Sequence, residues 1–113
     1  MALALSLASA RLVAEGDAAF RIGEELWLHD GTVGAVTFFG KTVGFVGAGG
    51  LSRSLQPLLE PFGVRFLAYD PWLDDRALKD RGIESVDLPT LFDESDLVYV
   101  LAVPTADNRH LVS

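Results

Sequence analysis

The chain has 113 residues, the size of a single domain with a real hydrophobic core. Its 16 acidic and 9 basic residues give a net charge of −7, which argues against nucleic acid or an anionic membrane as a partner, because both require clustered lysine and arginine. The absence of cysteine excludes disulfides, zinc sites built on thiolates and a cysteine nucleophile.

The first 41 residues carry no motif for chemistry. Alanine and leucine recur at helical spacing from residue 2 to about residue 21, which predicts one long helix with a possible interruption at Gly16–Asp17. Residues 22–41 show no sustained period and are expected to form a connecting segment with aromatic anchors such as Trp27. No apolar run reaches the roughly 20 residues that a membrane-spanning helix needs.

A glycine-rich turn follows the first predicted strand, residues 42–46. Gly47 and Gly49 let the backbone turn tightly and approach a pyrophosphate, and the backbone N–H groups of Gly50 and Leu51 then open a helix that faces the anion. Strand, glycines and helix in this order are typical of a dinucleotide-binding βαβ unit.

The helix after the glycines is expected from Gly50 to Glu60. Ser52 occupies the third glycine position of the motif, where a small residue serves close packing of helix on strand. Pro57 lies inside this helix and predicts a kink or a loose turn, because proline removes one backbone hydrogen bond.

A second strand, residues 64–69, ends in the carboxylate of Asp70. Asp70 follows the glycines by about 20 residues, the spacing expected for an acceptor of ribose hydroxyl hydrogen bonds. Its charge would repel a 2′-phosphate, and Pro71 and Trp72 follow it rather than an arginine, so the sequence favours NAD over NADP.

The remaining pattern continues an α/β fold. A polar helix is expected over residues 73–81, a short strand over 83–86, a helix over 89–94 and an apolar fourth strand over 97–103. We therefore predict a partial Rossmann-like, doubly wound parallel sheet of about four strands in the order 3-2-1-4, preceded by the long N-terminal helix. The cofactor crevice would open between residues 47–51 and 103–105.

From Gly40 to Ser113 the chain resembles the nucleotide-binding domain of D-isomer-specific 2-hydroxyacid dehydrogenases. The residues that carry the resemblance are Gly40-Lys41-Thr42-Val43-Gly44, Pro61-Phe62-Gly63-Val64, Tyr69-Asp70-Pro71, the set Leu88, Leu91, Glu94, Ser95 and Asp96, and Val103-Pro104-Thr105. The resemblance implies NAD as cofactor, a D-2-hydroxy acid or 2-oxo acid as substrate, and a cytoplasmic homodimer in which the N-terminal helix lies in the interface.

The expected cofactor-binding residues are Gly47, Gly49, Gly50, Leu51, Asp70, Pro71, Val103, Pro104 and Thr105. Residues 1–41 would be the helix and connector, and residues 42–113 the N-terminal half of a dinucleotide-binding domain, here truncated. The family's catalytic arginine, glutamate and histidine would lie outside the chain, so we expect no catalytic residue, no metal site and no activity from these residues alone. His29 and His110 are expected on the surface.

Two alternatives of other classes remain open from the residues. The chain could be a stand-alone, non-catalytic dinucleotide-binding or dimerisation module. A methyl-transfer cofactor is the weaker alternative, because an acidic residue at the end of the second strand also suits the ribose of other adenosine cofactors.

Overall fold

The computed structural model describes residues 1–24, 34–103, 105 and 109–110. The chain divides into two compact units, Met1–Phe39 and Gly40–Ser113. No described helix combines the length and the apolar character that crossing a membrane requires.

Where a single helix was predicted, over residues 2–21, the structure has two helices. Helix α1 spans Ala2–Ala10 and helix α2 spans Val13–Arg21, and the break falls at Leu12, whose φ of 57° is left-handed. The expected interruption at Gly16–Asp17 is wrong, because Gly16 lies inside α2 and donates its N–H to the carbonyl of Leu12 at 3.0 Å. At the real break, the carbonyl of Ala10 accepts from the N–H of Val36 at 2.8 Å.

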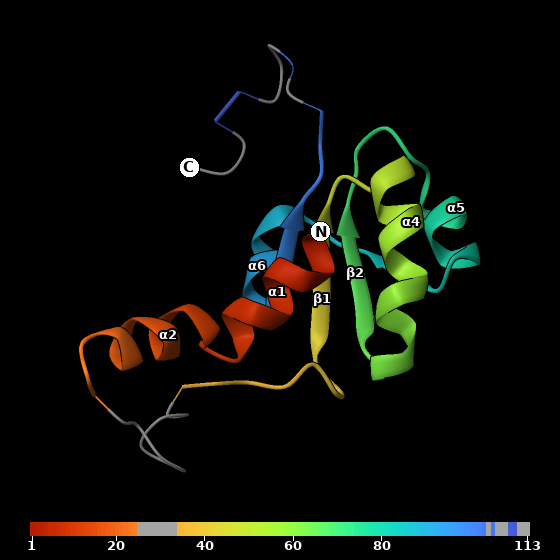
Figure 1. The fold of residues 1–113 in the computed structure, drawn as a ribbon. Helices are drawn as coiled ribbons and strands as arrows, with labels where there is room; N and C mark the ends of the chain where they lie inside the picture. The colour runs from red at the N-terminus through yellow and green to blue at the C-terminus, as the bar shows by residue number, and fades with distance from the viewer. Residues whose placement is uncertain (25–33, 104, 106–108, 111–113) are drawn as a thin grey trace. The chain divides into compact units, whose positions relative to one another are not determined.

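The second unit is built on a parallel sheet whose strands are β1 (Thr42–Val46), β2 (Arg65–Tyr69), β3 (Ile83–Ser85) and β4 (Leu97–Val100) (Figure 1). Their order is β3-β2-β1-β4, which confirms the predicted topology. Apolar side chains on the strands form much of the core, and Phe45 of β1 lies against Phe66 and Tyr99 with ring centroids 5.8 and 6.0 Å apart.

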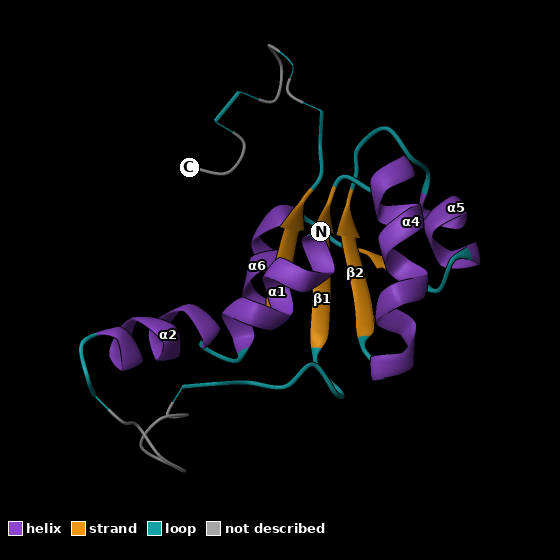
Figure 2. Cartoon of the chain, viewed as in Figure 1, coloured by secondary structure: helices purple, strands orange, loops and turns teal. Residues whose placement is uncertain are grey.

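Helices α4 (Gly50–Leu59) and α5 (Asp75–Asp80) lie on one side of the sheet, and α6 (Leu88–Glu94) lies on the other (Figure 2). This distribution follows from right-handed crossovers when the strand order reverses after β3. Helix α4 continues through Pro57 and passes directly into a 3₁₀ turn, η1, at Glu60–Phe62.

Gly44 lets α6 approach β1 closely. A Cβ at this position would lie 2.9 Å from the side chain of Leu91 and would overlap the Oγ of Ser95. Leu91 is fully buried, so it has little space into which it could move. Glycine is therefore required here for packing of the helix on the sheet.

Strand β4 is shorter than the predicted 97–103, because it ends at Val100. The N–H of Leu101 still reaches the carbonyl of Val46 at 2.9 Å. Beyond that point β1 offers no partner, since Gly47 turns the chain away with a φ of +94°. Val100, the last residue of this apolar strand, is 55% exposed.

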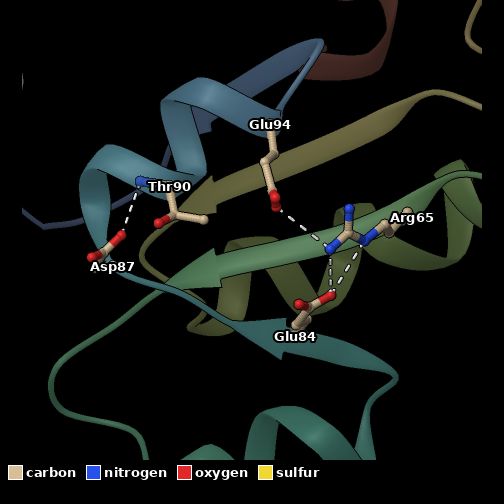
Figure 3. A network of polar contacts seen from close by, with 5 residues as sticks. All are labelled: Arg65, Glu84, Asp87, Thr90 and Glu94. Carbon is tan, nitrogen blue, oxygen red and sulfur yellow. Dashed lines mark hydrogen bonds and ion pairs between the residues drawn. The ribbon is translucent and has the colours of Figure 1, made fainter.

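Charged side chains tie the amino ends of the strands together. Arg65 Nη2 lies 2.7 Å from Glu84 Oε2 and 3.5 Å from Glu94 Oε2, which joins β2, β3 and α6 (Figure 3). The hydrogen bond to Glu84 is the main reason why the pKa of Arg65 is raised. This network lies at the opposite end of the strands from the site described next.

Candidate functional site

The loops that follow β1, β2 and β4 meet at the carboxyl ends of these strands. In an open parallel sheet, ligands bind at this edge where the strand order reverses, which here is between β1 and β4. A pocket of about 360 Å³ lies there. Its described lining residues are Gly47, Gly49, Arg53, Asp70, Trp72, Leu73, Leu101, Ala102, Val103 and Thr105.

Gly47 is required by the fold of the loop. Its φ is +94°, and a Cβ would lie 2.8 Å from the backbone nitrogen of Ala102. Its N–H donates to the carbonyl of Tyr69 at 3.0 Å, so the loop is also fastened to the end of β2. A side chain at this position would be both strained and in collision with the chain after β4.

Neither backbone conformation nor a described neighbour requires a glycine at position 49. Its φ is −81°, and a Cβ would meet no atom within 4 Å. Gly49 is also the residue before α4, and the first N–H groups of a helix have no partner within it. The space beside Gly49 therefore fits an anionic group that approaches the backbone closely.

Asp70, at the end of β2, is hydrogen-bonded to the loop of residues 47–51, called the glycine loop below. Its Oδ2 accepts from the N–H of Ala48 and its Oδ1 accepts from the N–H of Trp72, each at 2.9 Å. A carboxylate oxygen has more than one lone pair, so both oxygens can still accept hydroxyl groups of a ligand. Asp70 also lines the pocket, beside Gly49.

Ser52 and Arg81 also form hydrogen bonds with the backbone of the glycine loop. Ser52 is fully buried and donates its hydroxyl to the carbonyl of Gly49 at 2.7 Å. Arg81 Nη1 donates to the carbonyl of Ala48 at 2.7 Å, while its Nη2 donates to Ser52 Oγ at 3.1 Å and to Gln56 Oε1 at 3.2 Å. Burial, and then the nearby charge of Arg53, lower the pKa of Arg81.

Five of the nine predicted site residues come together in the pocket: Gly47, Gly49, Asp70, Val103 and Thr105. Gly50, Leu51 and Pro71 are not among its lining residues, and the side chain of Leu51 is 68% exposed. Gly50 does begin α4, so its backbone stands beside the loop. Pro104 lies outside the described residues.

Sequence reasoning missed Arg53, Trp72, Leu73, Leu101 and Ala102 among the lining residues. Arg53 lies one turn into α4 from Gly49, a spacing that could have placed it beside the pocket. It brings a positive charge, which suits a phosphate-bearing ligand. Arg53 and Asp70 are the ionisable side chains among the described lining residues.

No acid–base pair accompanies this pocket in the described part of the chain. His110 is exposed and does not line it, and His29 lies outside the described residues. Within those residues, no group of three acidic or histidine side chains is arranged to hold a metal ion. The arrangement can bind and orient an anionic, ribose-containing molecule.

Comparison with known proteins agrees with this geometry. The sequence model of the D-isomer specific 2-hydroxyacid dehydrogenase NAD binding domain matches residues 3–113. D-lactate dehydrogenase of Escherichia coli (strain K12) is 43% identical over 77 residues, which are 68% of this chain and 23% of that protein. Hydroxypyruvate reductase of Thermotoga maritima is 32% identical over 113 residues, which are 100% of this chain and 35% of that protein.

Solved structures show the same fold. A phosphoglycerate oxidoreductase from Rhizobium etli matches with a TM-score of 0.84 and 36% identity, over 88% of this chain and 33% of that chain. D-lactate dehydrogenase of Salmonella matches with a TM-score of 0.79 and 32% identity, over 98% of this chain and 32% of that chain. The chain thus spans about a third of the length of each of these two proteins.

Proposed function

Because this chain belongs to the D-isomer specific 2-hydroxyacid dehydrogenase family, through that family's NAD-binding domain, we propose that the pocket beside Gly49 and Asp70 holds the dinucleotide. We further propose that the full-length protein is an oxidoreductase. It would oxidise the CH–OH group of a D-2-hydroxy acid or reduce the matching 2-oxo acid. The bound cofactor would accept or donate the hydride, and this chain would bind and orient it.

The single observation that carries the proposal is that Gly49 and Asp70 line the same pocket. The open side of Gly49 leaves room for the pyrophosphate, and the N–H groups of Gly50 and Leu51 begin the helix that would stabilise it. The carboxylate of Asp70 lines the same pocket and would accept both hydroxyls of the adenosine ribose.

The loop after β4 completes the proposed binding site. Val103 and Thr105 line the pocket, and we propose that they and Pro104 contact the cofactor. Pro71 follows Asp70 and would direct the chain past the adenine. Arg53 would place a positive charge beside the cofactor phosphates.

A preference for NAD over NADP follows from the charge of Asp70. A 2′-phosphate would approach a carboxylate that already stands at the ribose position, and the two negative charges would repel. Arg53 lines the same pocket, but its charge would serve phosphates in either cofactor.

The substrate class rests on the relatives, which include a D-lactate dehydrogenase and a hydroxypyruvate reductase. Apart from Asp70, which we assign to the ribose, the described residues of the pocket offer no carboxylate or imidazole that could accept the proton of a hydroxy acid or donate one to a 2-oxo acid, so we assign the acid–base chemistry to another part of the full-length protein. We also propose a cytoplasmic homodimer. Four apolar side chains in or next to α1 and α2 would suit such an interface, since each is more than half exposed: Leu5, Val13, Phe20 and Ile22.

The proposal is tested in two steps on the purified full-length protein. NADH and NADPH are first titrated by the change in nicotinamide fluorescence, and we expect tighter binding of NADH. NADH oxidation is then followed with pyruvate, glyoxylate and hydroxypyruvate. Binding without turnover of any 2-oxo acid would favour a non-catalytic dinucleotide-binding module, and failure to bind either cofactor would refute the assignment of the pocket.

A further inference from the structure

Ala48, in the middle of the glycine loop, is held from two sides by charged groups. Its N–H donates to Asp70 Oδ2 at 2.9 Å, and its carbonyl accepts from Arg81 Nη1 at 2.7 Å. We propose that Arg81 is a positioning residue that fixes the glycine loop in the conformation that binds the cofactor pyrophosphate. This inference rests on the proposed function, but Arg81 is outside the family motif and is not a lining residue of the pocket.

The guanidinium makes three hydrogen bonds to this region. Besides the carbonyl of Ala48, it reaches Ser52 Oγ at 3.1 Å and Gln56 Oε1 at 3.2 Å, and both acceptors belong to α4. Gln56 in turn donates its Nε2 to the carbonyl of Arg81 at 2.7 Å, which fixes the backbone at the end of α5. The planar fork of arginine suits several acceptors at fixed positions, whereas a lysine ammonium is a single compact point of donation.

The hydroxyl of Ser52 connects this arrangement to the glycine loop. It donates to the carbonyl of Gly49 and accepts from Arg81, so one fully buried side chain bridges the loop and the guanidinium. A glycine at this third motif position would remove that bridge. Ser52 therefore does more than replace a small residue: it links the glycine loop to Arg81.

The three acceptors of Arg81 are neutral, and among the described residues no carboxylate forms an ion pair with it. No described carboxylate therefore neutralises its charge within ion-pair distance, and Arg81 contacts a loop that is proposed to bind an anion. The half-buried position strengthens the hydrogen bonds of a charged donor compared with an exposed one. Arg81 would thus both order the loop and raise the positive potential at it.

The test compares Arg81→Met, Arg81→Lys and the control Arg76→Met in the full-length protein. Arg76 is an exposed arginine on α5, so its replacement makes the same change of charge without touching the loop. NADH, NADPH and ADP-ribose are titrated against each variant. Amide hydrogen exchange of residues 47–51 is measured without any cofactor.

We expect Arg81→Met to lower the affinity for all three ligands by about tenfold or more. All three would contact the glycine loop, and this loop loses the charged group that donates a hydrogen bond to it. The ratio of the affinities for NADH and NADPH should stay unchanged, since Asp70, which is proposed to bind the ribose, is not altered. Exchange of the loop amides should accelerate in Arg81→Met, less in Arg81→Lys, and not in Arg76→Met. A general loss of stability would instead accelerate exchange in the core strands as well.

Wild-type affinity and wild-type loop protection in a folded Arg81→Met variant would overturn the inference. If Arg81→Met does not fold, Arg81→Lys carries the test, because it keeps the charge and loses only the fork. If the unaltered protein fails to bind any of the three ligands, the proposed function fails, while the exchange data still decide whether Arg81 orders the loop.

Discussion

The carboxylate of Asp70 accepts a hydrogen bond from the N–H of Ala48 at 2.9 Å, although 22 residues separate them in the chain. The side chain proposed to bind the ribose therefore also fixes the loop proposed to bind the pyrophosphate. Both parts of the adenosine diphosphate would meet groups that this contact joins directly. A substitution at Asp70 is expected to act on two parts of the ligand at once.

Asp70→Ala should lower the ratio of NAD to NADP affinity by about fivefold or more, since two unit charges about 4 Å apart repel by about 1 kcal/mol even in bulk water. The absolute affinity for NAD should also fall, because the N–H of Ala48 in the glycine loop loses its hydrogen-bond acceptor. Fluorescence titration with both cofactors measures the two effects separately.

Asp70→Asn serves as the matched control for this prediction. The amide oxygen can still accept from one of the two backbone donors, while the charge is gone. It should shift the cofactor ratio as Asp70→Ala does, with a smaller loss of absolute affinity. The same ratio before and after both substitutions would show that Asp70 does not face the ribose.

The two glycines of the loop should respond differently to a side chain. Gly47→Ala should destabilise the protein by about 2 kcal/mol or more, because a non-glycine residue with positive φ is strained and its Cβ would collide with the backbone at Ala102.

Gly49→Val should leave the helical circular dichroism intact and abolish cofactor binding, because its side chain would occupy open space that the pyrophosphate needs. Thermal unfolding and NADH titration separate the two outcomes, and unchanged NADH affinity in Gly49→Val would contradict the loop assignment.

Arg53 should contribute to cofactor binding through its charge. Arg53→Met is expected to weaken the binding of NADH by up to about fivefold, since an exposed charge pair contributes roughly 0.2–1 kcal/mol. The effect should shrink in high salt, because screening acts on exposed charges. Arg76→Met, which changes an exposed arginine on α5, provides the control, and an equal loss in both variants would exclude a specific role for Arg53.

The sequence allowed the sheet and the glycine loop to be predicted because their signals are local. Residues 42–46 form β1 with the predicted bounds, and the reversal of strand order followed from alternating strands and helices. The position of Asp70 at the end of β2 was equally readable, since a strand end and a motif spacing define it. These features depend on neighbours within a few residues and on a known topology.

Arg81 could not be predicted, because its role depends on contacts across 33 residues of sequence. At the sequence level it is one charged residue at the end of a polar helix. The break at Leu12 was missed for a related reason. Gly16 is a weaker helix former than Leu12, at a cost of about 1 kcal/mol, yet the helix breaks at Leu12, beside the hydrogen bond from the N–H of Val36 to the carbonyl of Ala10.

Asp87 should make the stability of the second unit depend on acid pH. Its side chain caps α6 by accepting from the N–H of Thr90 at 2.9 Å (Figure 3), and hydrogen bonds from the Thr90 side chain and backbone lower the pKa of Asp87. A carboxyl whose pKa is lower in the folded than in the unfolded state stabilises the fold above its unfolded pKa of about 3.9. That contribution is lost as the pH falls through the folded value.

Asp87→Asn removes this titration and keeps an amide oxygen that can cap the helix. Above about pH 5, well clear of the unfolded carboxyl pKa, the wild-type protein should therefore be the more stable of the two. Urea unfolding from pH 7 to pH 2.5 should show the difference closing in the acid range, because only the wild type loses a stabilising charge there. Asp93→Asn, which changes an exposed aspartate in the same helix, controls for net charge. A stability difference between wild type and Asp87→Asn that stays constant down to pH 2.5 would mean that the carboxylate of Asp87 does not stabilise the fold through its charge.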